Sequence, residues 1–251
     1  MNDFLDKIVA RTRERIEQEP LAEPQPCAER FAFARALSAP GVRIIAEIKS
    51  ASPSAGSIIV NPDIESIARE YASGGAAAIS IVTEPEFFRG SHDWIRRASI
   101  ASGLPVVMKD FIVDERQLRR GVAAGASAML LLASLLDGPM IRRFVSVLDG
   151  YGCDALVEVH DEDELARAID GGARIIGVNN RNLRDFRVDL RTAETLSARM
   201  PNGVIRVAES GIKTRQDVDR LRAAGYAAFL VGESLLRQND RAAAVRGLIE
   251  S

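Results

Sequence analysis

The chain has 251 residues, of which 47% are hydrophobic, and this is enough for one large α/β domain. Its net charge of −2 and pI of about 5.9 argue against a nucleic-acid-binding surface. Charged residues stand near the start, and the longest apolar run, residues 126–136, is too short to cross a bilayer. We therefore predict a soluble, cytoplasmic protein without membrane partners.

Metal and disulfide chemistry have few residues available. The chain contains two cysteines, Cys27 and Cys153, and two histidines, His92 and His160. These are too few for a disulfide framework or a zinc site. We predict that the protein holds no metal.

Residues 1–40 precede the first predicted strand. Apolar residues at helical spacing predict an amphipathic helix over 2–17, and a second short helix follows over 29–38. Between them, Pro20, Pro24 and Pro26 predict a connector. We expect this N-terminal helical extension to cover the bottom or rim of residues 41–251 within a single domain.

Eight apolar runs predict eight strands, near 42–48, 77–82, 105–109, 127–132, 154–159, 174–179, 204–209 and 227–231. Helix starts are indicated between them by Asp63, Asp114 with Gln117, Asp161 with Glu164, and Thr214 with Asp217. Small residues with glycine join helices to strands, as at 170–178. Eight βα units predict a closed (β/α)₈ TIM barrel. A doubly wound sheet is the alternative, but it would have fewer strands and a Gly-rich turn after the first.

Only four of the 33 basic residues are lysines, and two of these, Lys49 and Lys109, stand where predicted strands end. Arginine keeps its proton, whereas a buried lysine amine can lose its charge and act as acid, base or nucleophile. The placement therefore favours a chemical role. The alternative is chance, since lysine is common at strand boundaries.

The carboxyl ends of barrel strands form the active face. In chain order these ends carry Glu47 and Lys49, Lys109 and Asp110, Glu158 and His160, Asn179 to Arg181, Glu209 and Ser210, and Gly232 and Glu233. Glu47 and Lys49 share a strand face with Ile45, so both can point into the mouth. Lysines and glutamates converging there would shift one another's pKa values, as in acid–base catalysts. The alternative is a structural ion-pair lattice at the rim.

Glycines end the last two predicted strands. Gly211 follows the seventh strand and Gly232 with Glu233 follows the eighth, where many barrels bind phosphate through backbone amides. Only the backbone N–H of Glu233 is expected to contribute, because its carboxylate would repel phosphate. Each turn alone could be simply a tight turn.

Six segments together resemble the indole-3-glycerol-phosphate synthase family. They are IIAEIKSASPS (44–54), KDFIV (109–113), LVEVH (156–160), IGVNNRNL (176–183), VAESGI (207–212) and FLVGESL (229–235). The resemblance covers almost the whole chain. It implies a metal-free, cofactor-free lyase of tryptophan biosynthesis that closes 1-(2-carboxyphenylamino)-1-deoxyribulose 5-phosphate to an indole with loss of CO₂ and water.

The resemblance also implies roles for particular residues. Lys109 would be the general acid and Glu158 the base, while Glu47 would hold Lys109 and Lys49 would meet substrate anions. The expected substrate-binding residues are Ser52, Phe111, Asn179, Arg181, Glu209 and Ser210, and the expected phosphate-binding residues are Gly211, Gly232 and Glu233. Apolar walls for the anthranilate ring are expected from Ile81, Phe88, Phe111 and Leu132. Ala55 departs from the family's pattern, where many relatives have lysine, and it can weaken phosphate attraction or loop closure.

Two other functions stay open at this stage. A Schiff-base aldolase would also need a lysine in a barrel mouth, although the sixth strand ends in Asn179 and Asn180, where a familiar aldolase class has its lysine. A non-catalytic relative would be expected to lack Lys109 or Glu158. The expected partner is a small anionic substrate with phosphate and carboxylate groups, and a monomer is expected over an oligomer.

Overall fold

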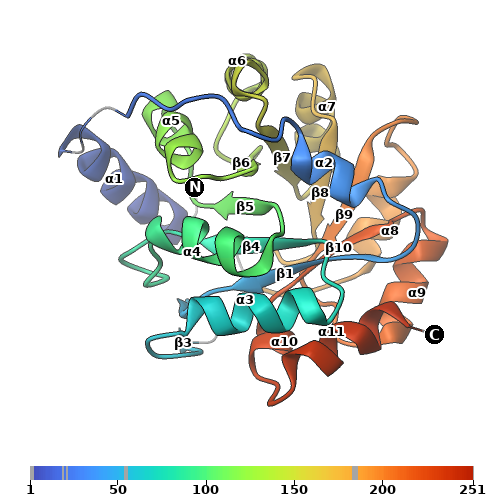
Figure 1. The fold of residues 1–251 in the computed structure, drawn as a ribbon. Coiled ribbons are helices and arrows are strands. Elements are labelled where there is room, and N and C mark those ends of the chain that lie inside the picture. The colour runs from blue at the N-terminus through green and yellow to red at the C-terminus, as the bar shows by residue number, and fades with distance from the viewer. Residues whose placement is uncertain (1–2, 19, 21, 54–55, 183–185, 251) are drawn as a thin grey trace.

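A computed structural model describes residues 3–18, 20, 22–53, 56–182 and 186–250. Its core is a closed barrel of parallel strands in the order β1-β10-β9-β8-β7-β6-β5-β4, as Figure 1 shows. The strands are β1 (Arg43–Ile48), β4 (Ala78–Val82), β5 (Val106–Lys109), β6 (Ala128–Leu132), β7 (Asp154–Val159), β8 (Ile175–Asn179), β9 (Ile205–Glu209) and β10 (Ala228–Val231). All eight predicted strands are confirmed, with bounds within one residue of those expected.

Helices surround the barrel. They are α3 (Ile64–Ser73), α4 (Asp93–Ser102), α5 (Glu115–Ala123), α6 (Gly138–Tyr151), α7 (Glu162–Asp170), α8 (Arg191–Ser197), α9 (Arg215–Ala223), α10 (Glu233–Leu236) and α11 (Arg241–Ile249). The predicted cap of Asp63 is confirmed, and so are the capping boxes at Asp114 and Thr214. Asp161 also caps its helix. None of the described helices is long and apolar enough to cross a membrane.

The predicted glycine joints have the expected backbone conformation. Gly125 has φ 93° and Gly172 has φ 83°, and each lies three positions before the first residue of a strand, β6 and β8 respectively. This left-handed region costs glycine little and other residues more. The chain can therefore leave each helix and enter the next strand within a few residues.

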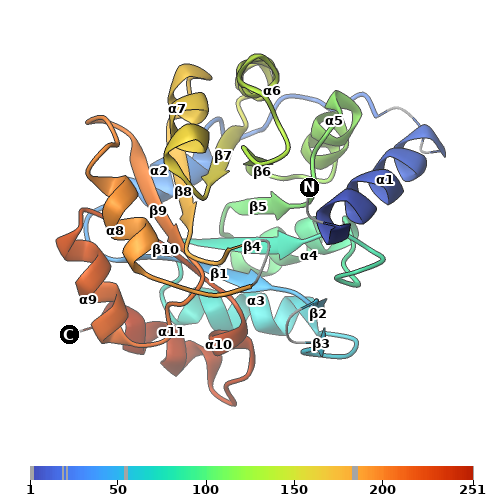
Figure 2. The same ribbon diagram turned by 180° about the vertical axis from the view of Figure 1, so that it is seen from behind.

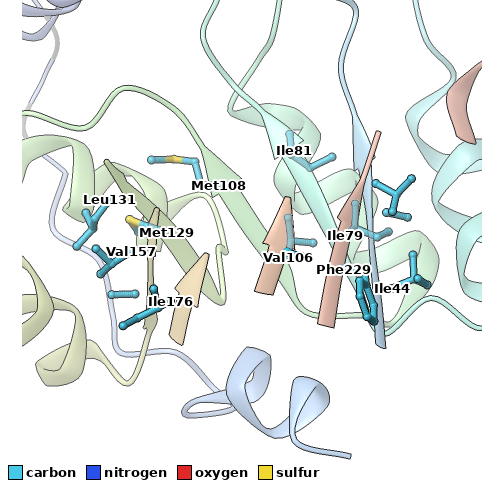
Figure 3. Close-up of a cluster of buried hydrophobic side chains, with 14 of the residues drawn as sticks. Ile44, Ile79, Ile81, Val106, Met108, Met129, Leu131, Val157, Ile176 and Phe229 are labelled. Atoms are coloured by element: carbon cyan, nitrogen blue, oxygen red, sulfur yellow. The ribbon is translucent and has the colours of Figure 1, made fainter. Parts of the chain in front are cut away.

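Strand side chains alternate between the barrel interior and the layer beneath the helices. Figure 3 shows part of the outer layer, which includes Ile44, Ile81, Met108 and Phe229. Ile81 is fully buried in that layer, so the prediction that it lines the mouth is wrong. The period of two sends Val82 inward instead, where it lines the main cavity.

The N-terminal extension contacts both ends of the barrel. Helix α2 (Ala32–Leu37) lies at the bottom, where the Ala34 N–H donates to Asp154 Oδ2 at 2.9 Å, at the first residue of β7. Helix α1 (Asp3–Gln18) lies beside α5 in both Figure 1 and Figure 2. The Arg116 guanidinium of α5 donates to the Ile16 carbonyl at 3.4 Å. Phe4 of α1 reaches the cavity at the mouth, so the extension covers the bottom and the rim.

A two-stranded hairpin follows β1. It consists of β2 (Ala51–Ser52) and β3 (Gly56–Ser57), paired antiparallel, and it can be followed beside the barrel in Figure 2. Ser52, expected to bind substrate, lies in this hairpin. Ala55, the departure from the family's pattern, lies outside the described residues.

Candidate active site

One cavity of about 1030 Å³ opens at the carboxyl ends of the strands. Apart from Ile81, the residues expected at the site line it, including those expected to catalyse the reaction or to bind substrate and phosphate: Glu47, Lys49, Ser52, Lys109, Phe111, Glu158, Asn179, Arg181, Glu209, Ser210, Gly211, Gly232 and Glu233. They come from six different βα connections or strand ends, which the sequence separates by up to 186 positions, from 47 to 233. Closure of the barrel brings them together.

Lys109 lies at the centre of the charged groups. Its Nζ donates to Glu158 Oε2 at 2.9 Å and to Glu209 Oε2 at 3.1 Å, and 22% of its side chain is exposed. Burial would lower the pKa of Lys109, but the charges of Glu158 and Glu209 raise it above its ordinary value. The ammonium form is therefore the one present at neutral pH. Desolvation alone would have favoured the neutral amine, and the neighbouring carboxylates reverse that effect.

The two carboxyl groups around Lys109 differ. Burial would raise the pKa of Glu158, but Lys109 and other donors lower it well below its usual range. For Glu209 burial prevails over the attraction of Lys109 and raises the pKa to about 8. At neutral pH the site thus contains an ionised Glu158 and a largely protonated Glu209. Burial and the negative charge of Glu158 oppose ionisation of Glu209, because two buried carboxylates this close together repel each other.

Glu158 is held from several sides. Its Oε1 accepts a hydrogen bond from the Asn179 amide at 3.0 Å, and the Asn179 Oδ1 in turn accepts from the Arg181 backbone N–H at 3.0 Å. His160 Nε2 lies 3.3 Å from the same Glu158 oxygen. The carboxylate therefore has a fixed orientation toward Lys109.

Glu47 pairs with Lys49 more directly than with Lys109. Lys49 Nζ donates to Glu47 Oε1 at 2.5 Å, whereas Glu47 acts on Lys109 through its charge. Gly232 leaves the space for this pair, because a Cβ there would lie 2.4 Å from Glu47 Oε1. Gly232 thus has a packing reason in addition to the phosphate role that the sequence suggested.

The position of the Glu209 carboxyl group also requires a glycine nearby. A Cβ at Gly177 of β8 would lie 2.2 Å from Glu209 Oε1. That oxygen is buried and has no hydrogen-bond partner within the described part of the chain. The role of Gly177 was not predicted, although the sequence carries a sign of it: a glycine interrupts an apolar strand at an inward-facing position.

Aromatic and aliphatic side chains form one wall of the cavity. The rings of Phe88 and Phe111 lie 5.8 Å apart, and Leu132 lines the same space, as expected. Phe4 of α1 and Phe186 add a second aromatic pair, with ring centroids 6.4 Å apart. This pair was not predicted, because nothing local in the sequence places the N-terminal helix over the mouth.

The turns after β9 and β10 line the other end of the cavity. Ser210 and Gly211 have φ of 63° and 82°, in the left-handed region. Lys213 also lines the cavity, so three of the four lysines of the chain are found there. The Glu233 carboxylate accepts from Arg237 at 2.8 Å, which neutralises a charge that would repel an anion.

The family follows from the sequence. The family model for indole-3-glycerol phosphate synthase matches residues 5–248. The indole-3-glycerol phosphate synthase of Koribacter versatilis is 45% identical to the chain, and the match covers 97% of the chain and 92% of the relative. That of Ruminiclostridium cellulolyticum is 40% identical, and the match covers 96% of each. The chain belongs to the indole-3-glycerol phosphate synthase family. The expected function, a carbon–carbon lyase of tryptophan biosynthesis that releases CO₂, is thereby confirmed.

Two solved structures resemble this chain in fold alone. A thiamine phosphate pyrophosphorylase from Pyrococcus furiosus matches with a TM-score of 0.60 and 16% identity over 82% of this chain and 93% of its own. KGPDC from Streptococcus mutans matches with a TM-score of 0.61 and 12% identity over 83% of this chain and 96% of its own. At these identities the likeness extends to the barrel and no further.

A network of hydrogen bonds at the rim of this synthase-family barrel was not predicted from the sequence. The fully buried Glu84 accepts from the backbone N–H groups of Phe87 and Phe88 at 2.6 and 3.0 Å, and Arg15 of α1 approaches its other oxygen at 3.4 Å. Asp110, next to Lys109, accepts from Thr83 Oγ1 at 2.6 Å. These bonds attach α1 and the aromatic wall to the rim. Among the described residues, no group of three or more His, Cys, Asp or Glu side chains is placed to bind a metal.

Proposed function

We propose that Lys109 and Glu158 are the acid and the base of the indole-3-glycerol-phosphate synthase reaction. The observation that carries the proposal is the 2.9 Å contact between two groups of opposite charge, a protonated amine beside an ionised carboxylate in the wall of the cavity. These are the forms that a proton donor and a proton acceptor must have before turnover.

The chemistry can be assigned step by step. The substrate is 1-(2-carboxyphenylamino)-1-deoxyribulose 5-phosphate. Lys109 gives a proton to the ketose carbonyl oxygen while the ring carbon that bears the carboxylate attacks the carbonyl carbon. The iminium formed by this attack then accepts the electron pair of the breaking C–CO₂ bond, so CO₂ leaves without an external electron sink. Glu158 removes a ring-system proton as the new hydroxyl leaves as water, and Lys49 is placed to supply the proton for that step.

The cavity suits a substrate with two anionic ends. Lys49 and Arg181 can meet the carboxylate, and the turns at Gly211 and Gly232 with Lys213 can meet the phosphate. The wall of Phe88, Phe111 and Leu132 can hold the anthranilate ring between them. We infer that Ser52, Asn179, Glu209, Ser210 and the Glu233 N–H complete the binding site. We also infer a monomer, since every residue given a role belongs to one barrel.

Fluorescence of the indole product tests the assignment. Lys109→Arg keeps the positive charge but cannot release a proton at neutral pH, so kcat should fall at least ~10²-fold. Glu158→Gln keeps the shape but cannot accept a proton, and kcat should fall ~10²–10⁴-fold with little change in KM. Lys7→Arg, on α1, is the matched control and should match the parent enzyme.

Two results would contradict the proposal. If Lys109→Arg stays within about tenfold of the parent kcat, the residue stabilises charge and is not the acid. If borohydride with substrate traps a covalent adduct on Lys109, the site works by Schiff-base chemistry, as an aldolase does.

A further inference from the structure

His160 lies behind Glu158, on the side away from Lys109. It directly follows β7, and its ring stands between two carboxylates. Nε2 is 3.3 Å from Glu158 Oε1, and Nδ1 is 3.0 Å from Glu164 Oε2. Glu164 Oε2 also accepts from the His160 backbone N–H at 2.8 Å. The sequence suggested that Glu164 caps α7, but its carboxylate holds His160 instead.

The imidazole of His160 carries a positive charge at neutral pH. Only 14% of its side chain is exposed, and burial would lower its pKa, but Glu158 and Glu164 raise it to about 10. Nε2 is buried and forms no aligned hydrogen bond with the described residues, so its contact with Glu158 is electrostatic. Glu158 is thus attracted by Lys109 on one side and by His160 on the other.

His160 does not line the cavity that would hold the substrate. It lines a second cavity of about 460 Å³, whose other charged residues are Asp161, Glu162, Asp189 and Arg191. Its ring therefore acts on the reaction only through Glu158. A group in that position can orient and charge a base without touching the substrate.

We propose that His160 is a positioning residue for the reaction: its imidazolium, held by Glu164, fixes Glu158 toward Lys109 and keeps it ionised. This inference rests on Glu158 being the base. The physical reason is burial, which favours the neutral form of a carboxyl group unless enough opposite charge surrounds it. Without His160, Glu158 would keep Lys109 and Asn179 but lose the charge behind it, and it would bind a proton at a higher pH.

The test is the pH profile of kcat for His160→Asn, which keeps a polar group near the position of Nδ1 but removes the charge. We expect kcat near neutral pH to fall about tenfold, KM to stay within about twofold, and the acid limb of the profile to move up by about half a pH unit or more. Glu164→Gln should move the limb the same way by less, because the imidazole stays in place but loses part of its charge. His92→Asn, which replaces the other histidine of the chain, should leave the limb unmoved.

The outcomes separate this inference from the assignment of Glu158. If Glu158→Gln keeps the parental kcat, Glu158 is not the base and His160 has nothing to position. If Glu158→Gln is slow while His160→Asn only lowers the melting temperature and keeps the parental profile, His160 is structural and the inference fails. A shifted limb in His160→Asn with an unshifted limb in His92→Asn supports it.

Discussion

Gly177→Ala tests whether Glu209 must stay where it is. Gly177 is in the extended strand β8, a backbone conformation that alanine adopts readily, so the perturbation is the added methyl group alone. That methyl group would lie 2.2 Å from Glu209 Oε1, whereas an ordinary contact begins at 3.4 Å, so the carboxyl group must move by about 1.2 Å, the difference of these two distances. The Lys109–Glu209 hydrogen bond, now 3.1 Å long, would break.

Misplacing a group next to the acid by about 1 Å can cost up to ~10²-fold, and we expect kcat of Gly177→Ala to fall between ~10- and ~100-fold. Overpacking should cost about 1–3 kcal/mol in the free energy of unfolding. Steady-state fluorescence of the indole product and urea unfolding measure the two effects separately.

Gly150→Ala, in α6, is the control, since a Cβ there has no atom within 4 Å. Adding Glu209→Asp to Gly177→Ala shortens the side chain by one methylene and should recover part of kcat. The reasoning is refuted if Gly177→Ala turns over within about twofold of the parent, because the position of Glu209 would then be unimportant.

Three further predictions concern pH, thiols and metals. The pKa of His160 is raised from 6.5 to about 10, so the stability that its charge contributes is complete below about pH 6.5 and is lost as the pH rises to about 10. The difference in melting temperature between His160→Asn and the parent should therefore shrink over that range. A constant difference would contradict this prediction. A hydrogen bond from Cys153 lowers the pKa of the half-buried Cys27 to about 7. Brief iodoacetamide treatment near pH 7.5 should therefore alkylate Cys27 before the buried Cys153, which peptide mass mapping measures. Exhaustive chelation should leave activity unchanged, and recovery only on adding Zn²⁺ or Mg²⁺ would contradict the prediction that the protein needs no metal.

Much of the fold could be predicted because the sequence patterns that indicate strands and helices involve only neighbouring residues. The apolar runs, the caps at Asp63 and Asp114, and the glycine at Gly172 each depend on a few neighbouring residues, and together they define the strands and helices. Eight such units allow few arrangements other than a barrel. The site residues could be found for the same reason, since they stand where the strands end.

The pairing of side chains across the barrel was decided by the tertiary structure. Lys109 meets Glu209 across 100 positions of sequence, and no local pattern says that Glu47 bonds to Lys49 while Glu158 and Glu209 share Lys109. The same holds for charge, since desolvation alone predicts a neutral lysine and only the distances to two carboxylates reverse it. The sequence thus determined which groups reach the mouth, because strand periodicity is local. Their partners and protonation states were decided by barrel closure, because electrostatic energy depends on distances that only the folded chain has.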